Sequence, residues 1–145
     1  MPTKCYIALQ KEDDTIDVIL CQYDGHLHGC GVKLEKYYGT YAKLRQLIDL
    51  GNLQSLGKTI GVRCFNKEEY KKQDYCVFLT RDLNKKQDQL FMTIEDIETL
   101  LSLCESEGVG LYVFNKDDKW YTTFNIFVEE ENNELRVLSE VIRKL

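Results

Sequence analysis

The amino-acid sequence predicts an α+β fold in which a mostly antiparallel sheet with hairpins is flanked by helices. The chain has 145 residues, close to the commonest domain size, so residues 1–145 are expected to form a single domain. Hydrophobic residues make up 43% and charged residues 30%, a balance that is typical of globular proteins and argues against disorder. The apolar segments run as two strands, helices, strands, a helix, a hairpin and a helix, and no proline beyond Pro2 marks a domain boundary.

The first elements expected are a hairpin and a short helix. Residues 4–10 and 16–22 are rich in β-branched and aromatic residues, and the polar residues 11–15 between them favour a hairpin turn. A glycine-spaced loop over 23–31 then leads into a short helix over 32–38.

The next helix is expected between Thr40, a suitable N-cap, and Gly51, a suitable stop. Its expected apolar face consists of Tyr41, Leu44, Leu47 and Ile48. The following segments are interpreted as a loop (53–61), strands (60–65 and 75–80) and two charged, exposed loops (66–74 and 81–89).

The clearest helix covers residues 93–107, where Thr93 and Asp96 resemble a capping box and Gly108 ends the periodic pattern. Its apolar stripe is Ile94, Ile97, Leu100, Leu101 and Cys104.

A second hairpin is expected over 109–115 and 119–128. One face of its second strand carries Trp120, Thr122, Phe124, Ile126 and Val128. A last helix beginning near Asn133 is expected to be appended to the domain within residues 129–145. One side of it carries Leu135, Leu138, Val141, Ile142 and Leu145.

The six cysteines are interpreted as reduced thiols of a cytosolic protein. Five of them lie inside or beside apolar runs, where a free cysteine behaves as a small hydrophobe, and no C-x-x-C pair is present. Those five are Cys5, Cys21, Cys64, Cys76 and Cys104.

The charge and hydropathy of the chain exclude several classes of function. Nineteen basic against 24 acidic residues give a net charge of −5, which argues against binding to long nucleic acid. No segment approaches the ~18 consecutive apolar residues of a membrane span. The first five residues, Met1 to Cys5, lack the charged-then-apolar pattern of a secretory signal.

The glycine-spaced loop is the most unusual stretch of the sequence. Gly25, Gly29 and Gly31 allow positive φ angles and close backbone approach, and the loop delivers the chain to a helix N-terminus that favours an anion. His26 and His28 add hydrogen-bond donors, and Tyr23 adds a stacking face. The plainer interpretation is a tight turn in which Asp24-Gly25 serves turn geometry alone.

Two further interpretations of the same loop receive less support. Cys21, His26, His28 and Cys30 are legitimate zinc ligands, but their spacing is cramped, so no metal site is expected. Asp24 with His28 offers a proton-transfer pair, yet no recognisable nucleophile accompanies it, so no catalytic residue is expected.

Two strand ends complete the set of candidate residues. Arg81 in Thr80-Arg81-Asp82 offers a planar fork for a phosphate, against the alternative of a surface ion pair with Asp82. Because neighbouring strand residues point to opposite faces, at most one of Trp120 and Tyr121 joins the core, which leaves the other free to stack on a ligand. The expected ligand-binding residues are therefore Tyr23, Asp24, Gly25, His26, His28, Gly29, Gly31, Arg81, Asp82, Trp120 and Tyr121.

Several segments together resemble a family of small bacteriophage proteins. Residues 19–25 with Gly29 and Gly31 are similar to that family's strand and aromatic-Asp-Gly-aromatic-Pro loop, and residues 51–57 are similar to its Leu-Gly-Asp-Ile-Ser-Ser-Leu-Gly loop. Thr80-Arg81-Asp82 resembles its His-Arg-Asp element, and residues 111–114 and 119–121 resemble its closing hairpin. The likeness covers residues 4–124 in the same order.

We identify this family as the one that includes the phage anti-Thoeris proteins. The resemblance implies a cytoplasmic protein of the infected bacterial host that sequesters a cyclic nucleotide immune signal without cleaving it. The implied ligand is a cyclised ADP-ribose or a cyclic oligonucleotide, and the implied assembly is a dimer or a larger homo-oligomer. No enzyme activity, cofactor or membrane partner is expected.

This sequence departs from the family pattern in the loop, where His26-Leu27 replaces aromatic-Pro, and at Thr80, which replaces histidine. Both changes affect the expectation of which nucleotide fits. Two other functions stay open: an inhibitor that binds a host protein through its charged surface, and a phosphodiesterase-like hydrolase built on Asp24, His26 and His28.

Overall fold

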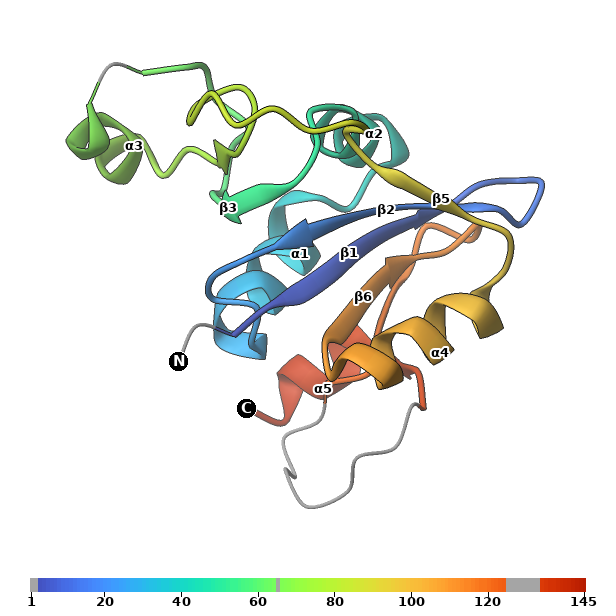
Figure 1. The fold of residues 1–145 in the computed structure, drawn as a ribbon. Helices are drawn as coiled ribbons and strands as arrows, with labels where there is room; N and C mark the ends of the chain where they lie inside the picture. The colour runs from blue at the N-terminus through green and yellow to red at the C-terminus, as the bar shows by residue number, and fades with distance from the viewer. Residues whose placement is uncertain (1–2, 65, 125–133) are drawn as a thin grey trace.

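The computed structural model describes residues 3–64, 66–124 and 134–145 (Figure 1). The strands in chain order are β1 (Cys5–Gln10), β2 (Ile16–Cys21), β3 (Leu53–Ser55), β4 (Val77–Phe78), β5 (Met92–Ile94), β6 (Gly110–Phe114), β7 (Trp120–Thr122) and β8 (Arg136–Val137). A π-helical turn, η1 (Leu27–Gly31), precedes the helices α1 (Val32–Tyr37), α2 (Tyr41–Asp49), α3 (Lys67–Gln73), α4 (Ile97–Glu107) and α5 (Leu138–Arg143).

The predicted α+β fold is confirmed as one domain built on a mixed, mostly antiparallel sheet. The strand order is β4-β3-β2-β1-β6-β7-β8, and β5 pairs with β2 beside β3. The pairs β1–β6 and β2–β3 are parallel, and the other pairs are antiparallel. The predicted hairpin of the first two strands is present, with Cys5 opposite Cys21.

The central strand β1 is buried on both faces, which explains its nearly continuous run of apolar residues. Cys5, Ile7 and Leu9 point into a core shared with α1, α2 and α5. Tyr6 and Ala8 point to the opposite face, which α4 covers. Helices therefore lie on both sides of the sheet, with α4 on the face opposite to α1 and α2 (Figure 1).

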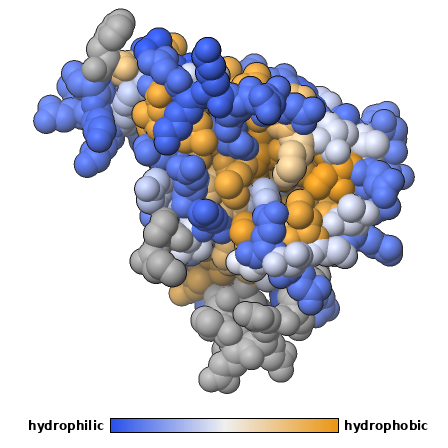
Figure 2. All heavy atoms as spheres, viewed as in Figure 1, coloured by the Kyte–Doolittle hydropathy of each residue, from blue (hydrophilic) through white to orange (hydrophobic). Residues whose placement is uncertain are grey.

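The face beside α4 also exposes apolar surface. Leu90 and Met92 are 39% exposed, and both line a shallow hollow with Leu20. Figure 2 shows hydrophobic residues gathered on this side of the molecule between the polar upper loops and α4.

The helix ends follow the capping rules. Thr40 accepts a hydrogen bond from Lys43 N, and Gly51 with φ +93° follows α2, as predicted. Gly108 with φ +65° ends α4, also as predicted. However, α4 begins later than expected, because Asp96 rather than Thr93 caps it by accepting from Thr99 N.

Other boundaries differ from the expectations. Residues 66–74 hold α3 instead of a loop, and residues 60–64 form no strand. Tyr41 is 47% exposed and lies off the apolar face of α2. The expected strand residues 125–128 and the expected helix start at Asn133 lie outside the described residues.

The last helix is shorter than expected and does not behave as an appendage. It begins at Leu138 after the short strand β8, so Leu135 precedes it rather than forming part of it. Leu138 and Val141 belong to the same core as β1 and α2. Among the described residues, every helix is too short or too polar to cross a membrane.

All six cysteines are free thiols, and five are buried. The partly exposed cysteine is Cys64, whereas Cys30, which lies outside the apolar runs of the sequence, is buried. The π-helical turn places Cys30 against the core, so the hydropathy of its immediate neighbours is a poor guide to its burial.

A buried carboxylate, Asp17, joins the hairpin to α2. Its oxygens lie 2.7 Å from Arg45 Nη1, 3.2 Å from Lys11 Nζ and 2.8 Å from Thr93 Oγ1. Burial disfavours the charged form, but the bonds from Arg45, Thr93 and Lys11 outweigh it and hold the pKa of Asp17 below its ordinary value.

We expect Asp17→Asn to lower the free energy of unfolding at pH 7 by about 2 kcal/mol, because Arg45 loses its buried partner. A depressed pKa gives stability that is present above the unfolded pKa of about 3.9 and is lost as pH falls through the lower folded pKa. The difference between the two proteins should therefore shrink below about pH 4, and urea unfolding at pH 7, 5 and 3 measures it. An equal difference at pH 7 and pH 3 contradicts this account.

Candidate ligand-binding site

A cleft of about 470 Å³ lies between the glycine-spaced loop and α3. This volume lies within the range of small-ligand sites. Its walls come from the start of the loop, α1, β3, α3 and the start of β4. The lining residues are Asp24, Lys33, Gln54, Ser55, Leu56, Lys67, Tyr70, Lys71, Asp74, Tyr75, Val77 and Leu83.

Lysines give this cleft its positive character. Lys67 and Lys71 are one helical turn apart on α3, so their side chains leave the same face of the helix. Lys33 reaches across from α1, and its ammonium lies 3.0 Å from Leu56 O and 3.2 Å from Asp74 Oδ1. With three lysines against two aspartates in the lining, the cleft carries a formal charge of +1 in a protein of net charge −5.

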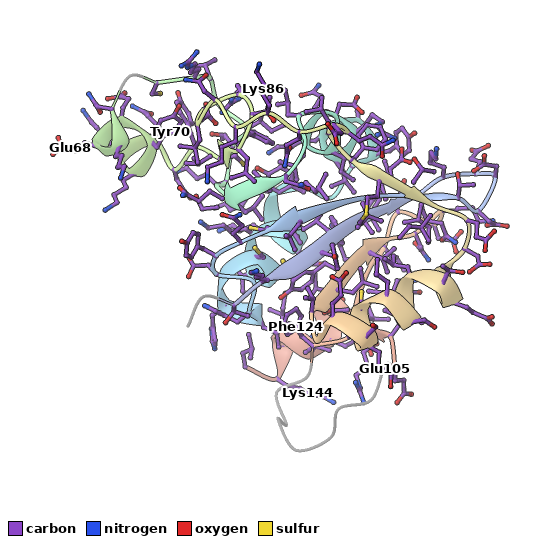
Figure 3. The ribbon with its side chains drawn as sticks, viewed as in Figure 1. Glu68, Tyr70, Lys86, Glu105, Phe124 and Lys144 are labelled. Atoms are coloured by element: carbon purple, nitrogen blue, oxygen red, sulfur yellow. The ribbon has the colours of Figure 1, made fainter. Side chains whose placement is uncertain are left out.

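Two tyrosines add aromatic surface. Tyr70 lies on α3 on the side toward the rest of the molecule, whereas Glu68 of the same helix projects outward (Figure 3). The hydroxyl of Tyr70 donates to Asp82 Oδ1 at 2.8 Å and accepts from Cys64 N at 2.7 Å. Burial and the neighbouring Asp82 raise the pKa of Tyr70, so the hydroxyl is neutral at pH 7.

Arg81 and Asp82 support the cleft wall from behind, and Arg81 is not available as the expected phosphate grip. Its guanidinium donates to the carbonyls of Ile60, Gly61 and Cys76 at 3.0–3.2 Å and to Asp82 at 3.0 Å. It also lies 4.7 Å from the ring centre of Phe78. The Asp82 side chain is fully buried, which overturns the alternative of a surface ion pair.

The glycines of the loop provide close approach rather than positive φ angles. A Cβ on Gly29 would lie 2.2 Å from Asp24 O, and one on Gly25 would lie 2.9 Å from the backbone of Lys4. Gly31 packs against Tyr112, and the positive φ in this loop belongs to Asp24, at 57°.

The expected anion site at the helix N-terminus is not formed. Gly29 N and Gly31 N donate to His26 O, and Cys30 N donates to Asp24 O. These donors are occupied within the turn, so the loop shapes one end of the cleft but offers an anion few free N–H groups.

The polar side chains of the loop are exposed. Asp24 lines the cleft, and His26 Nε2 lies 3.8 Å from its carboxylate with both side chains at least half exposed. His28 is exposed and does not line the cleft. Tyr23 is 44% exposed, and its backbone N–H donates to the cleft residue Gln54. Tyr23 therefore lies beside the cleft rather than in its lining.

Trp120 and Tyr121 are not near this cleft. They belong to β7, which lies four strands from β3 in the sheet. Trp120 is a core residue whose indole N–H donates to Tyr38 O at 3.0 Å, and Tyr121 is partly buried on the opposite face with α4. Of the expected ligand-binding residues, Asp24 lines the cleft. Asp82 does not line it but bonds to the lining residue Tyr70 from behind the cleft wall.

Sequence reasoning missed the residues of α3. Lys67, Tyr70 and Lys71 lie in segment 66–74, which the sequence predicts to be an exposed charged loop, and Lys33 is not among the expected ligand-binding residues. A signal was present, because Asn66 stands three residues before Glu69 and accepts a hydrogen bond from its N–H, as in a helix N-terminus.

Comparison of the chain with protein-family models, curated proteins and solved structures finds no match. The fold and the cleft define a small α+β protein with a cationic, tyrosine-containing cleft. This arrangement suits a small ligand that carries both negative charge and a flat ring.

Proposed function

We propose that this protein binds a cyclic nucleotide immune signal and sequesters it without cleaving it, as a phage anti-defence protein in the infected bacterial cell. The observation that carries the proposal is the cleft of about 470 Å³ lined by Lys33, Lys67 and Lys71 together with Tyr70 and Tyr75. The resemblance of residues 4–124 to the phage family supplies the class of ligand, a cyclised ADP-ribose or a cyclic oligonucleotide.

The chemistry of the cleft supports a nucleotide over other small anions. Ammonium groups make charge-assisted hydrogen bonds to phosphate oxygens, and a tyrosine ring offers a stacking surface for a base. Asp74 holds Lys33 at 3.2 Å, so a phosphate that enters the cleft competes with this carboxylate for the ammonium. Ligand binding is therefore expected to loosen the Lys33–Asp74 pair.

Sequestration requires enclosure as well as attraction. A second copy of the chain, placed against the mouth of the cleft, would supply the missing wall, and the exposed ring of Tyr23 lies beside the cleft. The proposal therefore includes a homo-oligomer, a dimer or larger.

The test is retention and recovery of the ligand. We expect the protein, incubated with cyclised ADP-ribose and washed, to release the intact molecule on heating at one equivalent per site, as measured by mass spectrometry. Bound ligand should also raise the melting temperature, since a ligand at about 100 times its dissociation constant adds about 2.7 kcal/mol to the free energy of unfolding.

Three outcomes contradict the proposal. Recovery of a hydrolysed product would favour the hydrolase built on Asp24, His26 and His28. Absence of any nucleotide effect, together with one host protein that co-purifies, would favour the host-protein inhibitor. A lysate with an activated defence system whose signal is not depleted by the protein would also contradict it.

A further inference from the structure

Three buried cysteines from distant positions in the chain meet beneath the glycine-spaced loop. The sulfur atoms of Cys5, Cys21 and Cys30 lie within 4.8 Å of one another. None of the three residues is more than 1% exposed. The sequence pattern pointed to Cys21 and Cys30 with two histidines, but His26 and His28 are exposed and Cys5 of β1 takes their place.

The fold holds all three side chains toward one point. Cys5 and Cys21 are cross-strand partners at the end of the hairpin, so their side chains leave the same face of the sheet. Cys30 belongs to η1 and packs against these two residues, and its sulfur lies 3.7 Å from that of Cys21. The tight contact of Gly29 with Asp24 fixes the turn that carries Cys30.

The spacing suits thiolate ligands of one metal ion. With metal–sulfur bonds of ~2.3 Å, two sulfurs at tetrahedral or trigonal angles lie ~3.8 to ~4.0 Å apart. The observed 3.7 Å between Cys21 and Cys30 is close to this separation, and Cys5 is within 4.8 Å of both.

The number of donors selects among metals. Within the described part of the chain, the cluster holds three candidate ligand atoms, and all are sulfur. Thiolate donors suit both Zn²⁺ and Cu⁺, but structural zinc takes four ligands and this cluster offers three. We propose that Cys5, Cys21 and Cys30 form a trithiolate site for a soft monovalent cation of the Cu⁺ class.

Protons must leave the thiols when the metal binds. Burial raises the pKa of Cys5, and the hydrogen bond to Cys21 raises that of Cys30, although the positive charge of Lys33 opposes the rise. Each thiol that becomes a thiolate ligand releases its proton, so Cu⁺ binding should be accompanied by proton release.

The experiment is an anaerobic titration of Cu⁺ against a chromophoric Cu⁺ chelator. It uses a Cys64→Ser background, because Cys64 is the partly exposed thiol and would bind Cu⁺ adventitiously. We expect one Cu⁺ per chain, a sulfur-only coordination shell of three atoms by X-ray absorption, and proton release measured with a pH indicator.

Matched variants connect the binding to the cluster. Cys30→Ala and Cys30→Ser should each weaken Cu⁺ binding at least 100-fold. Cys104→Ala should leave it unchanged, because Cys104 is buried on the opposite face of the sheet. The X-ray absorption measurement on the Cys64→Ser protein needs no cluster variant, so a Cys30 variant that fails to fold leaves the proposal testable.

Four results would overturn the proposal. They are no retained Cu⁺, a shell with fewer than three sulfurs, equal losses in the Cys30 and Cys104 variants, and Zn²⁺ binding as tight as Cu⁺ through the same thiols.

Discussion

Replacing Lys67 and Lys71 together by glutamate should abolish nucleotide binding and leave the fold intact. Both residues line the cleft, and α3 contributes no buried residue to either core. Hydrogen bonds to charged groups contribute about 1.5–3 kcal/mol each, so reversing two such charges should weaken binding at least ~100-fold. Exposed substitutions usually change stability by about 0.5 kcal/mol or less, and isothermal titration with thermal unfolding measures both quantities.

The matched control is Lys72→Glu with Lys86→Glu. It makes the same change in net charge at two exposed lysines that do not line the cleft. It should reduce affinity only slightly, since exposed charges at a distance are screened. Equal losses in the two double variants would mean that overall charge, rather than this cleft, governs binding, and unchanged affinity in Lys67→Glu/Lys71→Glu would place the site elsewhere.

Asp82→Ala should be among the most destabilising single substitutions in the protein. The buried carboxylate accepts from Phe78 N at 2.7 Å, Tyr70 Oη at 2.8 Å and Arg81 Nε at 3.0 Å. Its loss leaves a backbone donor unpaired and the partly buried guanidinium of Arg81 without its counter-ion, which should cost about 3 kcal/mol of unfolding free energy. Urea denaturation with linear extrapolation measures this loss.

Asp88→Ala is the control, because Asp88 is an exposed aspartate of the same 81–89 segment. Its effect should be within about 0.5 kcal/mol. Asp82→Asn should recover part of the stability, since an amide oxygen still accepts a hydrogen bond from Phe78 N. A loss in Asp82→Ala no larger than that in Asp88→Ala would refute the supporting role assigned to this carboxylate.

Those parts of the fold that depend on local signals were predictable from the sequence. The first hairpin follows from two apolar runs around a polar turn, and α2 follows from Thr40 and Gly51. The start of α4 was misplaced because Thr93 resembles a cap, but in the structure it pairs with Asp17 across from β2 and donates its hydroxyl there. Tertiary pairing overrides the local preference at this point.

The helix α3 was missed for a different reason. It buries no residue, so it leaves no apolar periodicity in the sequence, and its charged residues are typical of an exposed loop. It is held by its caps and by the hydrogen bonds of Tyr70 to Asp82 and Cys64 rather than by an apolar stripe.

Of the candidate site, the sequence predicted only the loop that borders the cleft. The loop motif correctly drew attention to residues 23–31, but the same pattern does not reveal that its N–H groups bond within the turn. Arg81 has the right chemistry for phosphate, and only the three-dimensional structure shows that its donors face the carbonyls of residues 60, 61 and 76. Likewise, Trp120 and Tyr121 were separated from the loop by the order of strands, which no short motif encodes.

The parallel pairing of β1 with β6 has a consequence for how the chain is made. Cys5 lies opposite Gly110 and Leu9 opposite Phe114, so the central strand gains its second neighbour only after more than a hundred further residues have been synthesised. Until then the nascent hairpin exposes one edge of β1. The sheet is therefore completed late in synthesis. Folding should be slower than that of a helical protein of this length, because the sheet depends on contacts between residues that are distant in sequence.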